Sequence, residues 1–418
     1  MKVKNLKYLL LVMSLSLPFS SCKDDEETKT EEPVKYTFTV NTTVSESGSN
    51  YYNGLTLQAG LSGSTDVIAE AVVSDGKAVF CSTKDLASEI SGKDVWFGVK
   101  GMVKFFHTMT EKEIADSSLT LPDKELGSSL SGDTNDWIVA LYMGVNKDGK
   151  SDGVPIYWAT GNLIAVKTSE AGEPTKAVFH IATAAENAEE SNPSTTEFVG
   201  LSKLLKRKEL DGYVDIPKGR KWDVYCFGDK TGLMLYDGTE LDDFVTDSKQ
   251  MVGDKIVYDI SGDKDFDIAT NLGGLWRTPT GGKTGLNEFA AFEDSFEEYA
   301  QMLPNHEPVG TPGENFSVNY KHTVVIDSKE VCVNTLNIPS AGYRHALAAM
   351  GRGSFVGLWS STADPTCTEV FYGNTGEEMP DIKVEPQTTA FAYSSLVKQT
   401  TWYAHPRTSS IAIRPVTE

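Results

Sequence analysis

The N-terminal part of the chain alternates hydrophobic and polar residues in short runs. In "YTFTV" (36–40) and "LTLQAGL" (55–61) every second residue is apolar, which is the period of a strand with one buried face. "VIAEAVVSDGKAVF" (67–80) predicts two strands joined by a tight turn at Asp75-Gly76, and "DVWFGVKGMVKFF" (94–106) adds one or two more. Short strands with frequent turns predict a small β-sandwich over residues 34–115.

A change of pattern follows this region. Residues 116–136 are rich in Ser, Gly and Asp and predict a linker. In segments 196–210 and 284–303 apolar residues recur at three- and four-residue steps, which is typical of amphipathic helices. The aromatic stripe of the second segment could line a ligand groove, but such stripes usually pack into a core, and we expect that here.

The first 21 residues have the pattern of a targeting segment. Lys2, Lys4 and Lys7 precede an apolar run that is too short to span a bilayer, and "LPFSSC" follows, ending at Cys22. This arrangement resembles the lipobox of bacterial lipoproteins, which implies a signal peptide over 1–21 and lipid on Cys22. The alternative is an ordinary secretory signal followed by an unrelated cysteine.

An acidic string, "KDDEE", comes directly after Cys22. It resembles the export tag that sends lipoproteins of the Bacteroidetes to the outer face of the outer membrane. The polar residues 22–33 lack core-forming side chains and predict a disordered tether. We therefore expect a lipid-anchored protein of the outer membrane, exposed at the cell surface.

Charge narrows the set of partners. The formal net charge is −21, and loss of the three lysines in residues 1–21 takes it to −24. Such a chain repels phosphate backbones and anionic lipid surfaces, so we expect neither nucleic-acid binding nor flat contact with a membrane.

The cysteines after Cys22 show no metal-binding spacing. Cys81, Cys226, Cys332 and Cys367 form no CxxC pair, which argues against a zinc site. A Cys332–Cys367 disulfide and buried free thiols are both compatible with the sequence.

A set of motifs in the second part of the chain occurs in a fixed order. They are "VPIYWATGNLIA" (154–165), "WDVYCFGDKTG" (222–232), "FDIATNLGGLWRTPT" (266–280), "NIPSAGYR" (337–344), "GLWSST" (357–362) and "IAIRPV" (411–416). Together they resemble the Fibrobacter succinogenes major paralogous domain of bacterial surface proteins. The resemblance implies a C-type-lectin-like fold over residues 137–418. With a fimbrillin-like sandwich before it, the expected fold class is mainly β, or α+β.

The most compact motif is "LGGLWRTPTGG" (272–282). We expect a fixed corner of the fold here rather than a binding pocket, with Trp276 filling core and Pro279 stiffening the turn. Arg277 is expected to hold a carboxylate with its planar fork, either Glu288 or an acid at a strand end.

Two groups of residues are candidates for binding. Asp263, Asp265 and Asp267 alternate in "GDKDFDIAT" and offer oxygen ligands to calcium, although the segment does not complete a calcium-binding hand. In "TTWYAHPRTSS" an expected loop gathers aromatic and hydrogen-bonding side chains that suit a sugar, although a tryptophan in such a segment more often caps the core. They are Trp402, Tyr403, His405 and Arg407.

Nothing in the sequence has the pattern of a catalytic site. There is no nucleophile elbow, P-loop or zinc-protease helix, and no cofactor is expected. The resemblance to a C-type-lectin-like module of bacterial surface proteins implies an adhesin-like binder of an extracellular glycan or protein. The alternatives are a self-assembling fimbrial or envelope subunit, an accessory protein of carbohydrate processing and, least favoured, a surface hydrolase.

Overall fold

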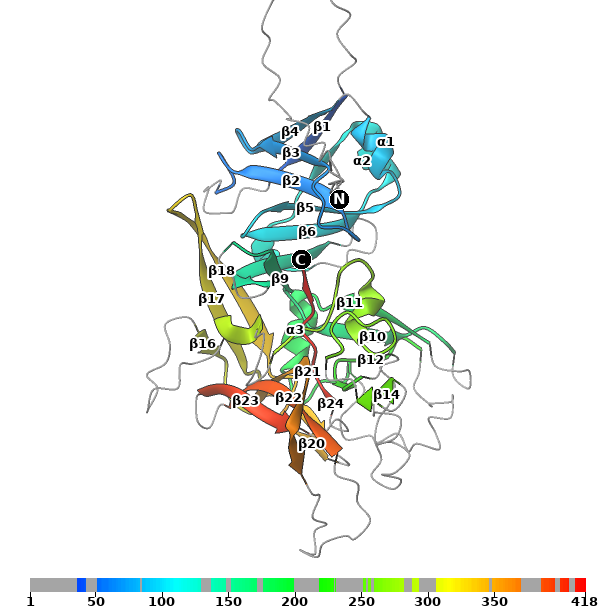
Figure 1. Ribbon diagram of the computed structural model, residues 1–418, viewed down its shortest axis with the longest axis vertical. Helices are drawn as coiled ribbons and strands as arrows, with labels where there is room; N and C mark the ends of the chain where they lie inside the picture. Colours follow the sequence, from blue (N-terminus) through cyan, green and yellow to red (C-terminus); the bar gives the residue numbers. More distant parts are fainter. Residues whose placement is uncertain are drawn as a thin grey trace, which may run out of the picture.

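The computed structural model describes most of the chain in segments. These are residues 36–42, 51–82, 85–128, 137–147, 152–170, 176–198, 218–228, 230, 251–252, 255–256, 259–281, 288–292, 306–345, 348–369, 385–394, 399–405 and 410–418. The expected signal peptide, Cys22 and the tether lie outside them. The described part is mainly β and holds several antiparallel sheets, as the alternating patterns predicted (Figure 1).

A seven-stranded sheet runs through the middle of the molecule. In spatial order its strands are β25 (Val416–Thr417), β9 (Pro155–Ala159), β8 (Ile138–Asn146), β6 (Val103–Thr108), β5 (Asp94–Val99), β2 (Thr56–Leu61) and β3 (Ala69–Val72). All neighbouring pairs are antiparallel. Strands from both expected domains therefore belong to one hydrogen-bonded sheet.

A three-stranded sheet contributes to the same core. It consists of β4 (Lys77–Ser82), β1 (Tyr36–Asn41) and β7 (Ser118–Thr120), with β1 and β7 parallel. The expected turn between β3 and β4 is confirmed: both Asp75 and Gly76 have positive φ, at 51° and 74°. The predicted alternation is confirmed at Phe38 and Val40, which are buried beside Leu57 and Ala59.

The expected linker is wrong for the described residues before 129. Asp116 ends helix α2 (Glu111–Asp116), and β7 follows. Leu119 and Leu121 are buried in the core, and the Leu121 amide donates to the Asn41 carbonyl. The Ser- and Gly-rich composition suggested a linker, but Leu119 and Leu121 are apolar residues at alternate positions. This short alternation is enough to form an edge strand.

The second part of the chain forms smaller sheets. One sheet has the order β11 (Ala177–Ile181), β10 (Leu163–Lys167), β12 (Lys221–Trp222), and another the order β13 (Tyr225–Cys226), β24 (Ser410–Ile411), β19 (Tyr343–His345), β20 (Ala348–Met350). Strands β14 (Met251–Val252) and β15 (Lys255–Ile256) form a two-stranded sheet. Two three-stranded sheets have the orders β16 (His306–Val309), β17 (Ser317–Ile326), β18 (Lys329–Pro339) and β21 (Phe355–Glu369), β22 (Glu385–Ser394), β23 (Gln399–His405).

The long β17–β18 hairpin projects alongside the N-terminal strands (Figure 1). The Asn334 amide in β18 donates to the carbonyls of Met102 (2.8 Å) and Tyr142 (2.9 Å), which joins the hairpin to the seven-stranded sheet. Lys124 adds a bond to the Val333 carbonyl.

Helices are short. Among the described residues they are, besides α2, α1 (Leu86–Ile90) and α3 (Ala184–Glu190), with 3-10 turns η1 (Lys124–Leu126), η3 (Ile268–Leu272) and η4 (Glu288–Ala291). The expected helix 196–210 lies almost wholly outside the described residues. Of the expected helix 284–303 only 288–292 is described, and its first four residues form a 3-10 turn rather than an α-helix. Among the described residues no helix is both long and apolar enough to cross a membrane.

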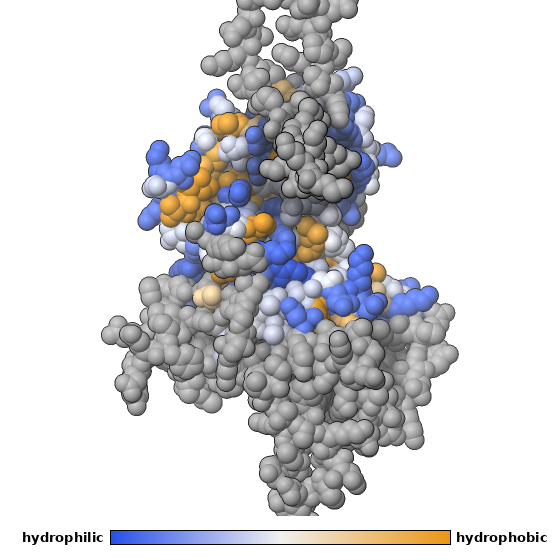
Figure 2. Space-filling model, viewed as in Figure 1, coloured by the Kyte–Doolittle hydropathy of each residue, from blue (hydrophilic) through white to orange (hydrophobic). Residues whose placement is uncertain are grey.

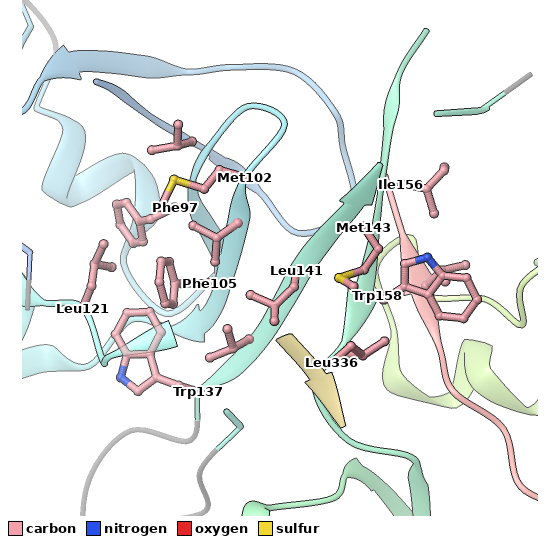
Figure 3. Close-up of a cluster of buried hydrophobic side chains, with 14 of the residues drawn as sticks. Phe97, Met102, Phe105, Leu121, Trp137, Leu141, Met143, Ile156, Trp158 and Leu336 are labelled. Carbon is pink, nitrogen blue, oxygen red and sulfur yellow. The ribbon is translucent and has the colours of Figure 1, made fainter. Parts of the chain in front are cut away.

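One hydrophobic cluster spans the two parts of the chain (Figure 3). Phe97 and Phe105 of the N-terminal strands, Leu141 of β8, Trp158 of β9 and Leu336 of β18 all belong to it. The Trp158 indole is fully buried. Its ring centroid lies 5.0 Å from that of Phe289 and 4.8 Å from that of Phe292, so the expected core role of these two aromatic residues is confirmed.

We predict that Trp158→Ala lowers the free energy of unfolding by about 3–5 kcal/mol, because a large cavity opens where the two parts share their core. Val72→Ala is the control: Val72 lies on the edge strand and is 60% exposed, so the loss should stay below about 1 kcal/mol. Urea unfolding followed by circular dichroism measures both. Equal losses in the two variants would contradict the shared core.

Candidate functional site

A cleft of about 310 Å³ opens on the face of the seven-stranded sheet opposite the main core. Its lining comes from strands and loops far apart in the sequence: Gln58, Thr65, Val67, Trp96, Gly98, Val99, Lys100, Lys104, Asp152, Gly153, Val154, Pro155, Tyr157 and Glu418. The cleft is therefore formed only when β2, β5, β6, β9 and the residues next to β25 come together.

Trp96 is held in one position by its neighbours. Gly60 on the adjacent strand β2 has no side chain, and a Cβ built there would lie 2.4 Å from the Trp96 ring, so the indole lies flat against β2. Its Nε1 donates to the Ser64 carbonyl at 3.0 Å. The ring is buried and fixes one wall of the cleft.

Gly98 makes room for the side chain of Lys104 in the same way that Gly60 makes room for Trp96. The two residues are directly paired across β5 and β6. A Cβ at Gly98 would meet the Lys104 Cγ at 3.0 Å and the Val103 carbonyl oxygen at 2.5 Å. The missing side chain thus lets the aliphatic stem of Lys104 lie across the sheet.

The Lys104 ammonium lies between two aromatic rings. Nζ is 3.9 Å from the centroid of the Trp96 ring and 5.3 Å from that of Tyr157, within the range of cation–π attraction. It donates to the main-chain oxygen of Glu418 at 2.7 Å. Burial lowers the pKa of Lys104 to about 8, against the opposing effect of Glu418.

Tyr157 forms the wall opposite Trp96 and is also fixed. Its hydroxyl accepts a hydrogen bond from the Gly101 amide at 3.0 Å. Burial raises the pKa of this phenol, so Tyr157 stays neutral in the physiological range.

Glu418 joins the cleft to the rest of the fold. Its carboxylate lies 2.6 Å from the Lys147 ammonium and 3.7 Å from the Arg277 Nε. Since its main-chain oxygen binds Lys104, Glu418 is in contact with three cations.

The rim of the cleft combines apolar and charged groups. Val67 and Val154 are each 43% exposed, and Lys100 and Asp152 are exposed as well. Figure 2 shows the same mixture on the surface of the part that holds β2 to β6, where apolar patches alternate with hydrophilic side chains. A ligand in the cleft would meet hydrophobic contacts at the rim and fixed polar groups below.

The Trp-Arg corner is close to this cleft and behaves as the sequence predicted. Arg277 grips Glu288 with both terminal nitrogens, at 2.7 Å and 2.5 Å. Glu288 is fully buried, and its carboxylate also accepts a hydrogen bond from the Thr280 amide, which fixes the turn in place. Trp276 is buried, 5.0 Å from Phe106 between ring centroids, so the expected core role is confirmed.

The calcium candidates are not arranged as ligands. Both carboxylate oxygens of Asp267 already accept hydrogen bonds from Thr278 and from the amides of Gly262 and Ala269. Asp265 is exposed and its amide binds the Asp263 carboxylate. Asp267 therefore stabilises the corner through these hydrogen bonds. Among the described residues there is no cluster of three or more His, Cys, Asp or Glu that could bind a metal.

Of the two expectations for Trp402, a core position and a ligand-binding face, the structure agrees with the core position. Trp402 lies on strand β23 rather than in a loop, is 8% exposed and packs against Phe289 and Phe391 at 5.1 and 5.7 Å between centroids. The side chains of Tyr403 and His405, and the whole of Arg407, lie outside the described part of the structure.

A second group of charged residues is buried away from the cleft lining. Arg352 binds the Asp223 carboxylate at 2.8 Å and the main-chain oxygen of Glu190 at 2.8 Å. Arg414, fully buried, donates to Asn162 at 2.9 Å, and Asn162 donates to Glu190 at 2.9 Å. This buried charge cluster ties helix α3 to the last strands.

The cysteines that are described differ from each other. Cys81 is disulfide-bonded, whereas Cys332 is a free thiol. A Cys332–Cys367 disulfide is therefore ruled out in this structure, which leaves the alternative of a free thiol for Cys332.

Comparisons of the chain with family models, curated proteins and solved structures gave no match. Sequence reasoning missed the cleft, because Trp96 and Lys104 lie in the segment 94–106, whose pattern predicted only strands. The only local signal was a pair of glycines, Gly60 and Gly98, inside strands that otherwise alternate, which marks a close approach of other groups.

The buried charge cluster generates a pH prediction. Burial, aided by Asp223, raises the pKa of Glu190 well above 4.5, although Asn162, Arg414 and Arg352 oppose the shift. The folded state thus binds this proton more tightly than the unfolded chain, so this group's contribution to stability is full below about pH 4.5 and is lost as pH rises.

Glu190→Gln removes the titrating group and keeps an oxygen for Asn162. The variant should gain stability relative to the wild type as pH rises from about 4 to 8. Urea unfolding at several pH values gives the two free-energy curves, and parallel curves would contradict the raised pKa.

Proposed function

We propose that this protein is a lipid-anchored surface protein that binds an extracellular ligand in the cleft between Trp96 and Tyr157. The supporting observation is an open hollow whose walls are held by hydrogen bonds and by glycine-permitted packing. Such preorganised sites lose little entropy when a ligand binds. Binding, rather than catalysis, is the activity that we propose.

The size and lining of the cleft favour a small ligand or the end of a larger one. A hollow of about 310 Å³ is at the lower limit of the range for small-molecule sites. Aromatic walls with a polar floor that includes Gln58 suit one sugar residue or one peptide side chain. An extracellular glycan or protein remains the proposed partner class.

The finer architecture is part of this proposal. We take the N-terminal strands as a fimbrillin-like sandwich and the second part as a C-type-lectin-like domain, supported by the ordered motifs and by the Arg277–Glu288 corner. The shared seven-stranded sheet then makes the two units one body, with the cleft at their junction.

The cleft is tested by filling it. Val154→Trp places a large ring at the rim and should abolish the thermal stabilisation that a bound glycan or protein confers. Val178→Trp is the matched control, since Val178 is a 53% exposed valine on β11 and is not among the lining residues. Residues 34–418 are screened on glycan and protein arrays, and hits are checked by thermal shift with both variants.

Two results would contradict this proposal. Hits that both variants retain would place binding elsewhere on the molecule. No hits at all, together with concentration-dependent ladders or filaments in light scattering and electron microscopy, would favour the self-assembling structural subunit instead.

The lipid anchor has its own test. Cys22 should carry diacylglycerol through its sulfur, which mass spectrometry of the mature N-terminal peptide detects, and Cys22→Ser should release the protein from the membrane fraction. A thioether-linked cysteine cannot form a disulfide, so finding Cys22 joined to Cys81 in a non-reducing peptide map would overturn the lipidation proposal.

A further inference from the structure

We infer that the cleft continues into a second subsite, formed by Tyr142 and His322, and that the ligand is an uncharged oligosaccharide long enough to occupy both. This inference rests on the proposed function and specifies the chemical class and the length of the ligand.

The first reason is an aromatic surface that continues from the wall of the cleft. Tyr157, which lines the cleft, pairs across β9 and β8 with Tyr142, and their ring centroids are 6.3 Å apart. Tyr142 in turn contacts the His322 imidazole edge to face, at 5.3 Å between centroids. Both Tyr142 and His322 are partly exposed. The lining residue Pro155 pairs with Asn146, whose side chain binds the Tyr142 hydroxyl, so the two groups of residues adjoin on the same two strands.

The second reason is that a glycine holds His322 in place. Gly144 of β8 is exposed and has a φ of 88°, and a Cβ built on it would lie 2.7 Å from the imidazole Cε1 and 2.9 Å from Nδ1. Glycine adopts this φ readily and leaves the space that the imidazole fills. Gly60 and Gly98 position two cleft residues in the same way, so the second subsite is preorganised like the first.

The third reason is a set of uncharged hydrogen-bonding groups. Neither ring nitrogen of His322 has a hydrogen-bond partner in the described part of the chain. Burial lowers the pKa of His322, so its imidazole is neutral in the physiological range, with one nitrogen that donates and one that accepts. The Tyr142 hydroxyl donates to Asn146 at 3.1 Å, and its oxygen can still accept a bond. A sugar hydroxyl, which both donates and accepts, matches these groups.

The charges of the cleft favour an uncharged ligand. Lys104 donates to Glu418, and Lys100 and Asp152 have opposite signs, so the charges of the lining sum to zero. A charged ligand would lose its hydration without gaining an unpaired partner, whereas an uncharged one only exchanges hydrogen bonds with water.

Strand pairing favours a sugar chain over a peptide. Tyr157 pairs with Tyr142 on one side and with Thr417 on the other, so β9 offers no free edge at this place to the main chain of an extended peptide. Aromatic rings and neutral hydrogen-bonding side chains are the groups that remain, and they suit consecutive sugar units.

The experiment varies the length of an uncharged sugar. The full-length protein is purified in a detergent that has no sugar headgroup, and binding is measured by calorimetry and ligand-detected NMR. The probes are glucose, mannose and N-acetylglucosamine, each with its disaccharide and trisaccharide. For a sugar that binds, the disaccharide should bind at least about tenfold more tightly than the monosaccharide, because it contacts both subsites, and the trisaccharide should add less than about threefold.

Variants separate the two subsites. His322→Ala should weaken disaccharide binding by at least about fivefold and leave the affinity for the monosaccharide within about twofold of the wild type. His322→Gln, which keeps a donor and an acceptor, should retain much of the disaccharide affinity. Thr323→Ala is the matched control, since Thr323 is the next residue of β17 and is exposed, and it should leave both affinities unchanged.

The outcomes distinguish this inference from the proposed function. Equal affinities for monosaccharide and disaccharide, an unchanged disaccharide affinity in His322→Ala, or equal weakening of both sugars by it would overturn the inference and leave the proposed cleft intact. Failure of every one of these sugars while another array hit binds would do the same. Failure of these sugars and of every array hit to bind the folded wild type would overturn both.

Discussion

The structure depends on the antiparallel ladder between β6 and β8. This ladder pairs Val103 with Leu141 and Phe105 with Val139, and it joins strands that the sequence composition had assigned to two separate domains. Because the ladder continues the pleat, core-facing and cleft-facing residues alternate in register from β5 to β9 as far as Tyr142, beyond which the β8–β9 pairing shifts. One face then carries Phe97, Phe105 and Trp158 into the core, and the other carries Trp96, Lys104 and Tyr157 into the cleft.

The cleft exists because two small residues break that second face. Gly60 makes room for an indole and Gly98 for a lysine stem, so the side chains lie along the sheet instead of standing away from it. The corner built by Arg277 and Glu288 lies next to it through Glu418, which contacts Arg277, Lys147 and Lys104. The Arg277–Glu288 corner, which the sequence predicted to be structural, is thus linked through Glu418 to the cleft, which the sequence did not predict.

Local patterns predicted local structure well. The Asp75-Gly76 turn, the alternation at Phe38 and Val40 and the Arg277–Glu288 pair follow from residue chemistry within a short window or from one close pair of opposite charges. The sequence left two roles open for Trp402, because a tryptophan beside polar residues has the same pattern on a buried strand as in a binding loop. The cleft could not be predicted from local patterns for a related reason. The hydrogen bond between Lys104 and Glu418 joins residues 314 positions apart, and no periodicity of the sequence indicates such a contact.

The place of β25 has a consequence for how the chain folds. Val416 pairs with Trp158, 258 positions earlier, so the edge of the central sheet is completed by a strand that is synthesised long after its partner. Contacts of such sequence separation impose a large loop-closure entropy and slow folding. Strand β9 therefore keeps an open edge until β25 arrives. Under the proposed lipid anchoring the chain would cross a membrane before it folds, and late closure of this kind would keep it competent for export.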